Sequence, residues 1–232
     1  MTSTLRILHT NCQLLPTFLR EWWGLFCSER GVSNRVMVFL DYQNLTTSAR
    51  EQFPRTAGMR AFSHIDPFRL AQLIVGRRNY PSELVEVRVY RGRPNPNRQP
   101  AAAAANDIQA SAWERNPRVT AVRRMLRYPK NYPFSPPQEK GIDVALAVDF
   151  VRQAFLGAYD VGVVVSHDTD LVPALEAVRE LRLAHVEVAG WRGRNRLQFP
   201  ESKLPWHHDL SEDDFAAVRD DTDYLAGRRH GD

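Results

Sequence analysis

The sequence predicts an α/β fold in which a central, mostly parallel sheet is covered by helices on both faces. Residues 36–40 and 161–165 are uninterrupted apolar runs, which are typical of parallel strands buried on both faces. Segments with helical character separate these runs from two further strand-like segments, at residues 85–90 and 185–189. Strands that alternate with helices of this length favour a parallel sheet.

The composition of the chain excludes several classes of protein. The chain has 232 residues, 43% hydrophobic and 25% charged, as expected of a globular domain rather than a disordered or fibrous chain. The net charge of +4 is compatible with a polyanionic partner. Cys12 and Cys27 have neither the spacing of a zinc site nor the density of a disulfide scaffold, which favours a cytoplasmic location. Pro16, Arg20 and Glu21 interrupt the apolar pieces near the start, so neither a membrane span nor an export signal is predicted.

The first half of the domain starts with the strand at residues 36–40. Asp66 and Pro67 predict an N-cap and a first-turn proline for a helix that continues to about residue 75. A strand at residues 85–90 follows, then a proline-rich loop at 93–100 and a helix at 101–113. Residues 118–127 either continue as a helix or end as a strand at Met125 and Leu126.

The second half repeats the alternation. A proline-rich connector at residues 129–137 precedes a helix at 142–155, the strand at 161–165, a helix at 171–183 and the strand at 185–189. We interpret residues 1–34 as an N-terminal extension with a short amphipathic helix around 14–26, and residues 35–200 as the main domain. Residues 201–232 form an acidic tail that packs on or flanks the domain, through Trp206, Phe215 and Tyr224.

Acidic residues follow the buried strands. Asp41 comes directly after the first apolar run, Asp168 and Asp170 follow the second, and Asp143 begins the helix between them. Ligand sites of open α/β sheets form outside the carboxyl ends of the strands. Three segments are therefore expected to bring four carboxylates to one pocket.

Such a pocket has a specific chemistry. Crowded carboxylates repel one another unless a hard cation with oxygen ligands, such as Mg²⁺ or Mn²⁺, neutralises them. These ions activate water and stabilise the oxygens of an in-line displacement at phosphorus. The pattern predicts phosphodiester hydrolysis.

Each acid also has a structural interpretation. Asp168 and Asp170 fit caps of the helix that follows them. Asp41 fits a simple turn, since residues 43–45 give no clear helix signal. Asp149 lies six residues from Asp143, a rotation of roughly 240°, so we expect it to be solvated or paired elsewhere.

Two neighbouring basic residues are also ambiguous. Lys140 lies three residues before Asp143, where it contacts phosphate or is a plain surface lysine. His167 is interpreted as a surface-loop histidine, with proton transfer as the alternative. The pair His207 and His208 lacks companions at the spacing of a metal site.

Three ordered segments within residues 35–189 resemble the three motifs of NYN domains, a family of the PIN-like nuclease superfamily. They are Val38-Phe39-Leu40-Asp41-Tyr42-Gln43-Asn44-Leu45, Lys140-Gly141-Ile142-Asp143-Val144 and Val165-Ser166-His167-Asp168-Thr169-Asp170-Leu171. The resemblance implies a PIN-like three-layer α/β/α sandwich and metal-dependent RNA cleavage.

The resemblance also implies roles for single residues. Asp41, Asp143, Asp168 and Asp170 would be metal-site carboxylates, and Asn44 and Ser166 would orient metal, water or phosphate. His167 stands where many members of the family have a small residue such as glycine, so its part in catalysis stays open.

A nuclease needs basic residues beside its acidic pocket to contact phosphates. The expected RNA contacts lie near strand ends: Arg91, Arg93, Lys140, Arg192, Arg194 and Arg196. Tyr90 and Trp191 are expected to stack on unpaired bases. Packing in the core is the alternative for Trp191. Arg123, Arg124 and Arg127 are interpreted as helix-surface charge.

Two other functions compete with this one. Residues 168–172 match the Asp-x-Asp-x-Val pattern of haloacid-dehalogenase-like phosphatases, in which Asp168 would be a nucleophile, but a strand with its own Asp41 comes much earlier. A non-catalytic RNA-binding module is the second alternative. We predict a metal-dependent ribonuclease with RNA as its partner and endonucleolytic cleavage favoured; a homo-oligomer or a protein partner is left open.

Overall fold

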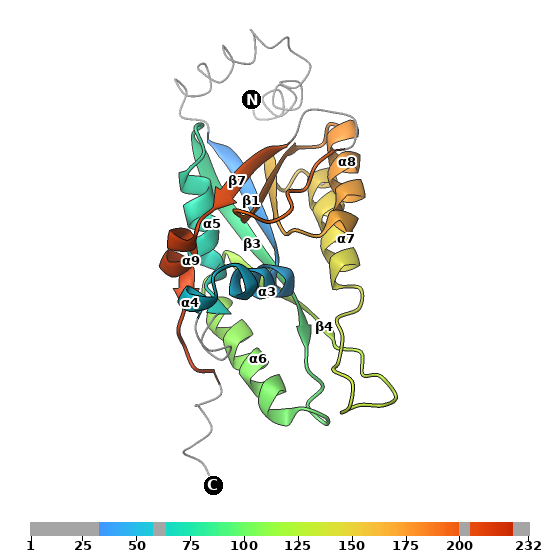
Figure 1. Ribbon diagram of the computed structural model, residues 1–232. Helices are drawn as coiled ribbons and strands as arrows, with labels where there is room; N and C mark the ends of the chain where they lie inside the picture. The colour runs from blue at the N-terminus through green and yellow to red at the C-terminus, as the bar shows by residue number, and fades with distance from the viewer. Residues whose placement is uncertain (1–32, 58–63, 200–204, 225–232) are drawn as a thin grey trace.

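The computed structural model describes residues 33–57, 64–199 and 205–224 and is built on a six-stranded parallel sheet (Figure 1). The strand order is β4-β3-β1-β5-β6-β7, and every neighbouring pair runs parallel. The strands are β1 (Asn34–Asp41), β3 (Ser82–Arg93), β4 (Val119–Met125), β5 (Val161–Val165), β6 (His185–Trp191) and β7 (Trp206–Leu210). The predicted α/β class and its mostly parallel sheet are therefore confirmed.

Strand β1 is the centre of the sheet, which explains its unbroken apolar sequence. Its residues 36–40 are at most 3% exposed, because helices cover both faces and strands flank both edges. Leu40 is in register with Val89 of β3 and Val165 of β5. The residues that follow β1 and β5 therefore emerge side by side at one edge of the sheet.

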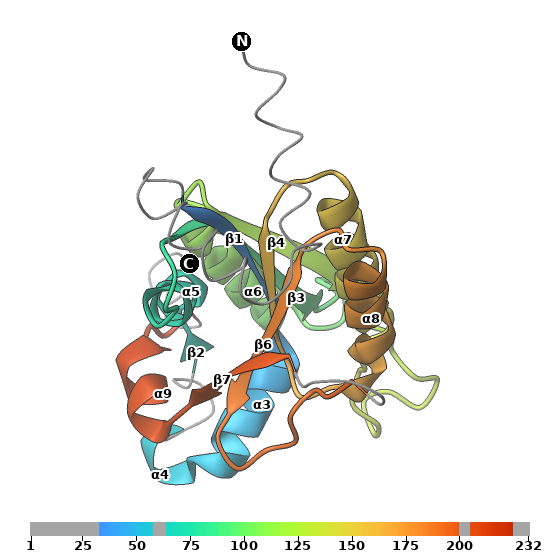
Figure 2. The same ribbon diagram turned by 90° about the horizontal axis from the view of Figure 1, so that it is seen from above.

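Two helical layers complete the α/β/α sandwich. One face is covered by α3 (Tyr42–Gln52), α5 (Pro67–Gly76), α6 (Pro100–Trp113) and α9 (Glu212–Val218), and the other by α7 (Ile142–Phe155) and α8 (Val172–Glu180). From above, α3, α5 and α9 lie on the opposite side of the strands from α7 and α8 (Figure 2). The short helices α4 (Pro54–Ala57) and η3 (Thr169–Leu171) and the antiparallel pair β2 (His64–Ile65) and β8 (Arg219–Asp220) complete the described chain.

The helix after β1 corrects the sequence interpretation, which found no helix at residues 43–45. Asp41 caps α3, and the Thr46 and Ser48 hydroxyls donate to the carbonyls of Tyr42 (2.8 Å) and Asn44 (2.6 Å), four residues earlier. Only Tyr42, Leu45 and Ala49 place apolar surface in the core. Because the buried residues Thr46 and Ser48 are polar and bond to the backbone of the helix, its sequence lacks a clear apolar period.

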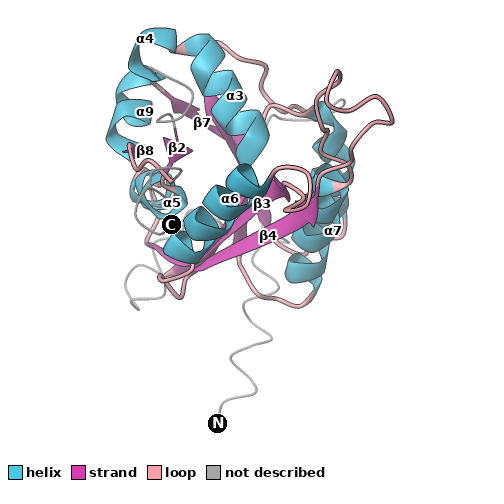
Figure 3. Cartoon of the chain, turned by 90° about the horizontal axis from the view of Figure 1, so that it is seen from below, coloured by secondary structure: helices cyan, strands magenta, loops and turns pink. Residues whose placement is uncertain are grey.

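Two other boundaries differ from the prediction. Residues 119–125 form the strand β4, so of the two predicted alternatives for this segment the strand is correct. Arg123 therefore lies on the sheet rather than on a helix. Helix α8 ends at Glu180, three residues early, and Arg182 then adopts a positive φ of 54° in the turn to β6. The region of β4 and α6 is seen from below in Figure 3.

The part of the chain after residue 204 contributes to the same core. Strand β7 pairs with β6 along Glu187 to Trp191, and Leu210 and Phe215 are fully buried. Trp206 is 54% exposed and Tyr224 is half-buried. The amphipathic helix expected around residues 14–26 lies outside the described residues. Among the residues that are described, no helix has the length and apolar character needed to cross a membrane.

Candidate active site

A pocket of about 760 Å³ opens at the carboxyl edge of the sheet. Its walls come from α3, from the start of α7, and from the loops after β5 and β6. Five carboxylates from three separate parts of the chain line this pocket: Asp41, Glu51, Glu139, Asp143 and Asp168. This convergence depends on the register of β1 with β5, which aligns the two strand ends.

Asp41 is the most buried of these carboxylates, at 7% exposure. Its Oδ1 accepts a hydrogen bond from the Asn44 N–H (3.3 Å) as the N-cap of α3, and its Oδ2 accepts from the Ser166 hydroxyl (3.0 Å). Burial raises the pKa of Asp41 to about 6, and the charges of Asp168 and Asp143 add to the rise. The site therefore contains negative charge that its own hydrogen bonds do not fully compensate.

Ser166 connects the first and third motifs. It is 2% exposed, donates its hydroxyl proton to Asp41, and accepts a hydrogen bond from the Asp168 N–H (3.0 Å). Asp168 in turn caps η3 by accepting from the Asp170 N–H (3.0 Å). Ser166 lies behind the carboxylates and positions them rather than lining the pocket.

The remaining predicted acids occupy different places. Asp143 lies in the first turn of α7, after Gly141, whose left-handed φ of 73° allows the chain to turn into the helix, and it is half-buried in the pocket wall. Asp170 is exposed and does not line the pocket. The structure thus brings three of the four predicted carboxylates to the pocket.

Glu139 was not expected from the sequence, because it lies at the end of a proline-rich connector. It is half-buried and accepts a hydrogen bond from the Gly92 N–H on β3. Burial raises the pKa of Glu139, and the charges of Asp41 and Asp143 raise it further. Its position directly before the Lys140-Gly141-Ile142-Asp143 segment was the available signal.

His167 is not the surface-loop histidine that the sequence suggested. Its backbone N–H donates to Asn44 Oδ1 (3.0 Å), which ties the loop after β5 to α3. The ring lies against β6, where Nε2 accepts from the Trp191 N–H (3.2 Å) and Nδ1 contacts the Asn195 carbonyl (2.9 Å). These partners require a neutral ring with the proton on Nδ1, and burial lowers the pKa of His167 accordingly.

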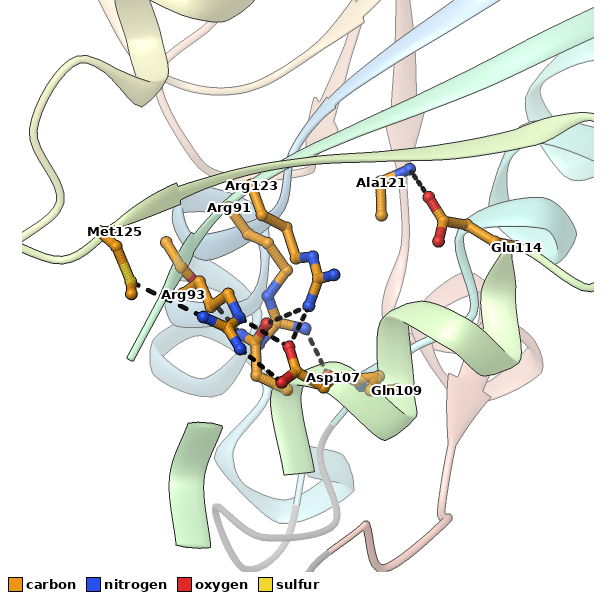
Figure 4. A network of polar contacts seen from close by, with 10 residues as sticks. Arg91, Arg93, Asp107, Gln109, Glu114, Ala121, Arg123 and Met125 are labelled. Carbon is orange, nitrogen blue, oxygen red and sulfur yellow. Dashed lines mark hydrogen bonds and ion pairs between the residues drawn. The ribbon is translucent and has the colours of Figure 1, made fainter. Parts of the chain in front are cut away.

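Most of the predicted RNA-contacting arginines have partners within the protein. The guanidinium of Arg91 lies over the rings of Tyr42 (4.9 Å) and Trp113 (5.4 Å) and donates to Gln109, so it does not face the pocket. Arg93 shares Asp107 with Arg123 (Figure 4).

The predicted RNA-contacting residues after β6 and before α7 are partly paired and partly exposed. Arg194 pairs with Glu51 across the pocket, and Arg196 pairs with Asp209. Arg192 is exposed, and Lys140 is exposed at the pocket.

Tyr90 and Trp191 are core residues and do not stack on bases. Both are at most 1% exposed; the Tyr90 hydroxyl donates to Asp149 (2.7 Å), and the Trp191 Nε1–H donates to the Leu45 carbonyl (2.9 Å). Asp149 also pairs with Arg88 (2.8 Å), which confirms that it is paired away from the pocket.

The donor set can be compared with the needs of a divalent cation. Within the described ranges, no three His, Cys, Asp or Glu side chains converge closely enough to hold a metal by themselves. Mg²⁺, however, is usually bound through one or two carboxylates, with water and substrate phosphate completing its shell. Asp41, Asp143 and Asp168 supply oxygen ligands of this kind in an open, charged pocket, so the residues fit a partly hydrated hard cation.

The parallel α/β/α sandwich with acids at its carboxyl edge defines a protein of the PIN-like nuclease superfamily. The NYN domain profile matches residues 35–201, and the chain belongs to this family. The family assignment does not support the haloacid-dehalogenase-like alternative. No curated protein is significantly similar to the chain.

One similar solved structure is a protein of unknown function from Vibrio parahaemolyticus. It is 16% identical over 71% of this chain and 85% of its own, with a TM-score of 0.47.

Proposed function

We propose that this protein is a ribonuclease that depends on Mg²⁺ or Mn²⁺ and hydrolyses RNA phosphodiester bonds at the acidic pocket. The observation that carries the proposal is the convergence of Asp41, Asp143 and Asp168 on one pocket of a protein in a nuclease superfamily. Neutralising these carboxylates requires a cation, and the same cation would place an RNA phosphate next to them.

The protein's own residues would position the reactants. Asp41 is held by Ser166 and by the Asn44 N–H, so its carboxylate is presented in one orientation. Lys140, exposed at the pocket, can contact a non-bridging phosphate oxygen. The bound cation would polarise the phosphate and activate water. In the hydrolysis, the water oxygen bonds to phosphorus while the bond to the leaving ribose oxygen breaks, and that oxygen leaves with a proton.

RNA would bind to basic side chains near the pocket that make no ion pair or can exchange their present partner for a phosphate. Arg192 and Lys140 make no ion pair in the described structure, while Arg194 would exchange Glu51 for a phosphate. Arg93 and Arg196 are paired with aspartates, so they would attract RNA only by long-range electrostatics and would not contact a phosphate. We further infer a cytoplasmic location from the use of cysteine. We also infer that residues 35–200 carry the nuclease motifs, while β7 and α9 complete the sheet and the core of the same domain.

The test is cleavage of a labelled single-stranded RNA by the full chain in Mg²⁺, Mn²⁺ or EDTA. Asp41→Asn and Asp168→Asn should abolish metal-dependent cleavage, whereas Asp213→Asn, an exposed acid on α9, should not. Cleavage that survives both pocket variants, or that is equal in EDTA, would contradict the proposal.

The second candidate is a non-catalytic RNA-binding module, which the absence of three converging ligands within the described residues favours. RNA binding by the wild-type protein without cleavage in either metal would decide for it.

A further inference from the structure

Residues 127–138 form a closed loop between β4 and α7, which we call the aromatic loop. The backbones of Arg127 and Gln138 exchange two hydrogen bonds, of 2.8 and 2.9 Å, at its base. Glu139 and Lys140 follow directly and line the acidic pocket. In Figure 1 the loop extends from the carboxyl edge of the sheet, between the end of β4 and the start of α7.

The loop contains three aromatic side chains, Tyr128, Tyr132 and Phe134. Phe134 is 93% exposed, the highest exposure among the large apolar residues of the described chain. The rings of Tyr128 and Tyr132 pack edge to face at 5.0 Å, and Arg98 lies over both, at 5.1 and 5.8 Å. A phenylalanine left almost wholly in water has no stabilising role in the folded chain.

Local hydrogen bonds hold the loop in shape. The Tyr128 hydroxyl donates to Gln99 Oε1 (2.7 Å) and accepts from the Asn95 N–H (2.9 Å), which fastens the loop to the turn after β3. Around Phe134, its N–H donates to the Asn131 carbonyl (2.9 Å), and the Asn131 side chain donates to Ser135 (2.7 Å). The aromatic ring is therefore presented on an ordered turn, which lowers the entropic cost of binding.

The sequence segment that contains the loop carries charge of one sign. No Asp or Glu occurs between residues 115 and 138, while six arginines and lysines do. Of these, Arg124, Arg127 and Lys130 are exposed and pair with no carboxylate in the described structure. Arg124 also reaches toward Gly141, because its Nε lies 3.9 Å from the position of a Cβ at that glycine. The positive surface is thus continuous with the pocket.

We propose that the aromatic loop binds single-stranded RNA leading out of the pocket, with a base stacked on Phe134 and phosphates paired with Arg127 and Lys130. Aromatic rings interleaved with cations fit this ligand because every unpaired base has a stacking face and every nucleotide a phosphate. In a duplex the bases already stack on one another, so the ring would gain no partner there. The proposal takes RNA as the ligand from the proposed function.

The test measures binding in EDTA, so that it does not depend on cleavage. We expect Phe134→Ala to weaken binding of a labelled single strand roughly tenfold and to leave binding of the matching duplex unchanged. Phe155→Ala is the matched control, because Phe155 is 76% exposed at the far end of α7. Equal single-strand affinity of wild type and Phe134→Ala, or an equal loss for the duplex, would overturn the stacking role.

The phosphate contacts have their own measurement. Arg127→Ala with Lys130→Ala should reduce the dependence of log K on log salt by about 0.7 for each lost contact. Arg118→Ala is the control that should leave the slope unchanged, because Arg118 is exposed directly before β4, at the opposite end of this strand from the loop. An unchanged slope in the double variant would overturn the electrostatic role.

The two proposals can fail separately. Binding that depends on Phe134 in a protein that never cleaves RNA supports the aromatic loop and contradicts the nuclease. Metal-dependent cleavage with binding that does not depend on Phe134 supports the nuclease and contradicts the aromatic loop.

Discussion

The hydroxyl of Ser166 donates a hydrogen bond of 3.0 Å to Oδ2 of Asp41, although the two residues are 125 positions apart. The hydroxyl oxygen of Ser166 also accepts a hydrogen bond from the Asp168 N–H, so this one side chain orders the acids that follow β1 and β5. Burial makes this bond valuable, because neither group exchanges it for water without a penalty.

Ser166→Ala tests this link. The change removes the bond that lowers the pKa of Asp41 and leaves the partly buried Asp168 N–H without its acceptor. We expect a loss of about 1–3 kcal/mol in the free energy of unfolding, measured in urea, and weaker cleavage at neutral pH. Ser111→Ala, at an exposed position of α6, is the control. Unchanged stability of Ser166→Ala would show that the bond contributes nothing.

Asp41→Asn should stabilise the metal-free protein at neutral pH. The carboxyl has a pKa of about 6 in the folded chain and an ordinary value of 3.8, so the folded state binds its proton more tightly. The stability associated with that proton is fully present below pH 3.8 and is lost as the pH rises through 6. The variant should therefore gain up to about 3 kcal/mol over wild type at pH 7.5, and the gain should vanish near pH 4.

Urea unfolding in EDTA across this pH range is the measurement. Asp213→Asn should differ from wild type by only a few tenths of a kcal/mol, since Asp213 is exposed in the first turn of α9. A wild type that is more stable than Asp41→Asn at pH 7.5 would contradict the assigned burial cost.

Divalent cations should raise the melting temperature of the wild-type protein at pH 7.5. A ligand that binds only the folded state stabilises it by about 2.7 kcal/mol at one hundred times its dissociation constant. Asp41→Asn and Asp168→Asn should lose most of this shift, whereas Asp170→Asn should keep more of it because Asp170 does not line the pocket. Equal shifts in all three variants would indicate that the cation binds elsewhere.

Gly190→Ala should disturb His167. A Cβ at residue 190 would lie 2.5 Å from Cε1 of the His167 ring, which is too close for any real contact. We expect a loss of about 1–3 kcal/mol in the free energy of unfolding. In Gly190→Ala with His167→Ala, the added methyl group should cost less, because the ring that it meets is absent.

The matched control is Gly76→Ala at the end of α5, where a Cβ meets nothing within 4 Å. If both glycine variants lose the same stability, contact with His167 is not the cause.

Much of the fold could be predicted because strands that are buried on both faces consist of apolar residues. The apolar runs at residues 36–40 and 161–165 became β1 and β5, at the centre of the sheet. The helix α3 could not be predicted, since two of its buried positions hold Thr46 and Ser48, which bond to its own backbone, and too few apolar positions are left for a period. The interpretation of residues 118–127 stayed open for a related reason, because β4 is an edge strand with only one fully buried residue.

Some functional residues could be predicted from the sequence and others could not. Asp41, Asp143 and Asp168 were found because each directly follows a strand or starts a helix. Arg91 was assigned to RNA from its place at a strand end, but the rings of Tyr42 and Trp113 enclose it. Sequence position shows where a backbone leaves the sheet, but the direction of a long side chain depends on neighbours from other elements.

The sequence by itself determined the parallel sheet, the succession of its central strands and helices along the chain, and the three segments that carry the acids, because these depend on local apolar patterning. The tertiary structure decided which charges share a pocket, which arginines already have partners, that Glu139 joins the acids, and that Phe134 is exposed in the loop that precedes Glu139. These relations depend on contacts between residues far apart in the chain, and only the packed fold brings such residues within a few ångströms of one another.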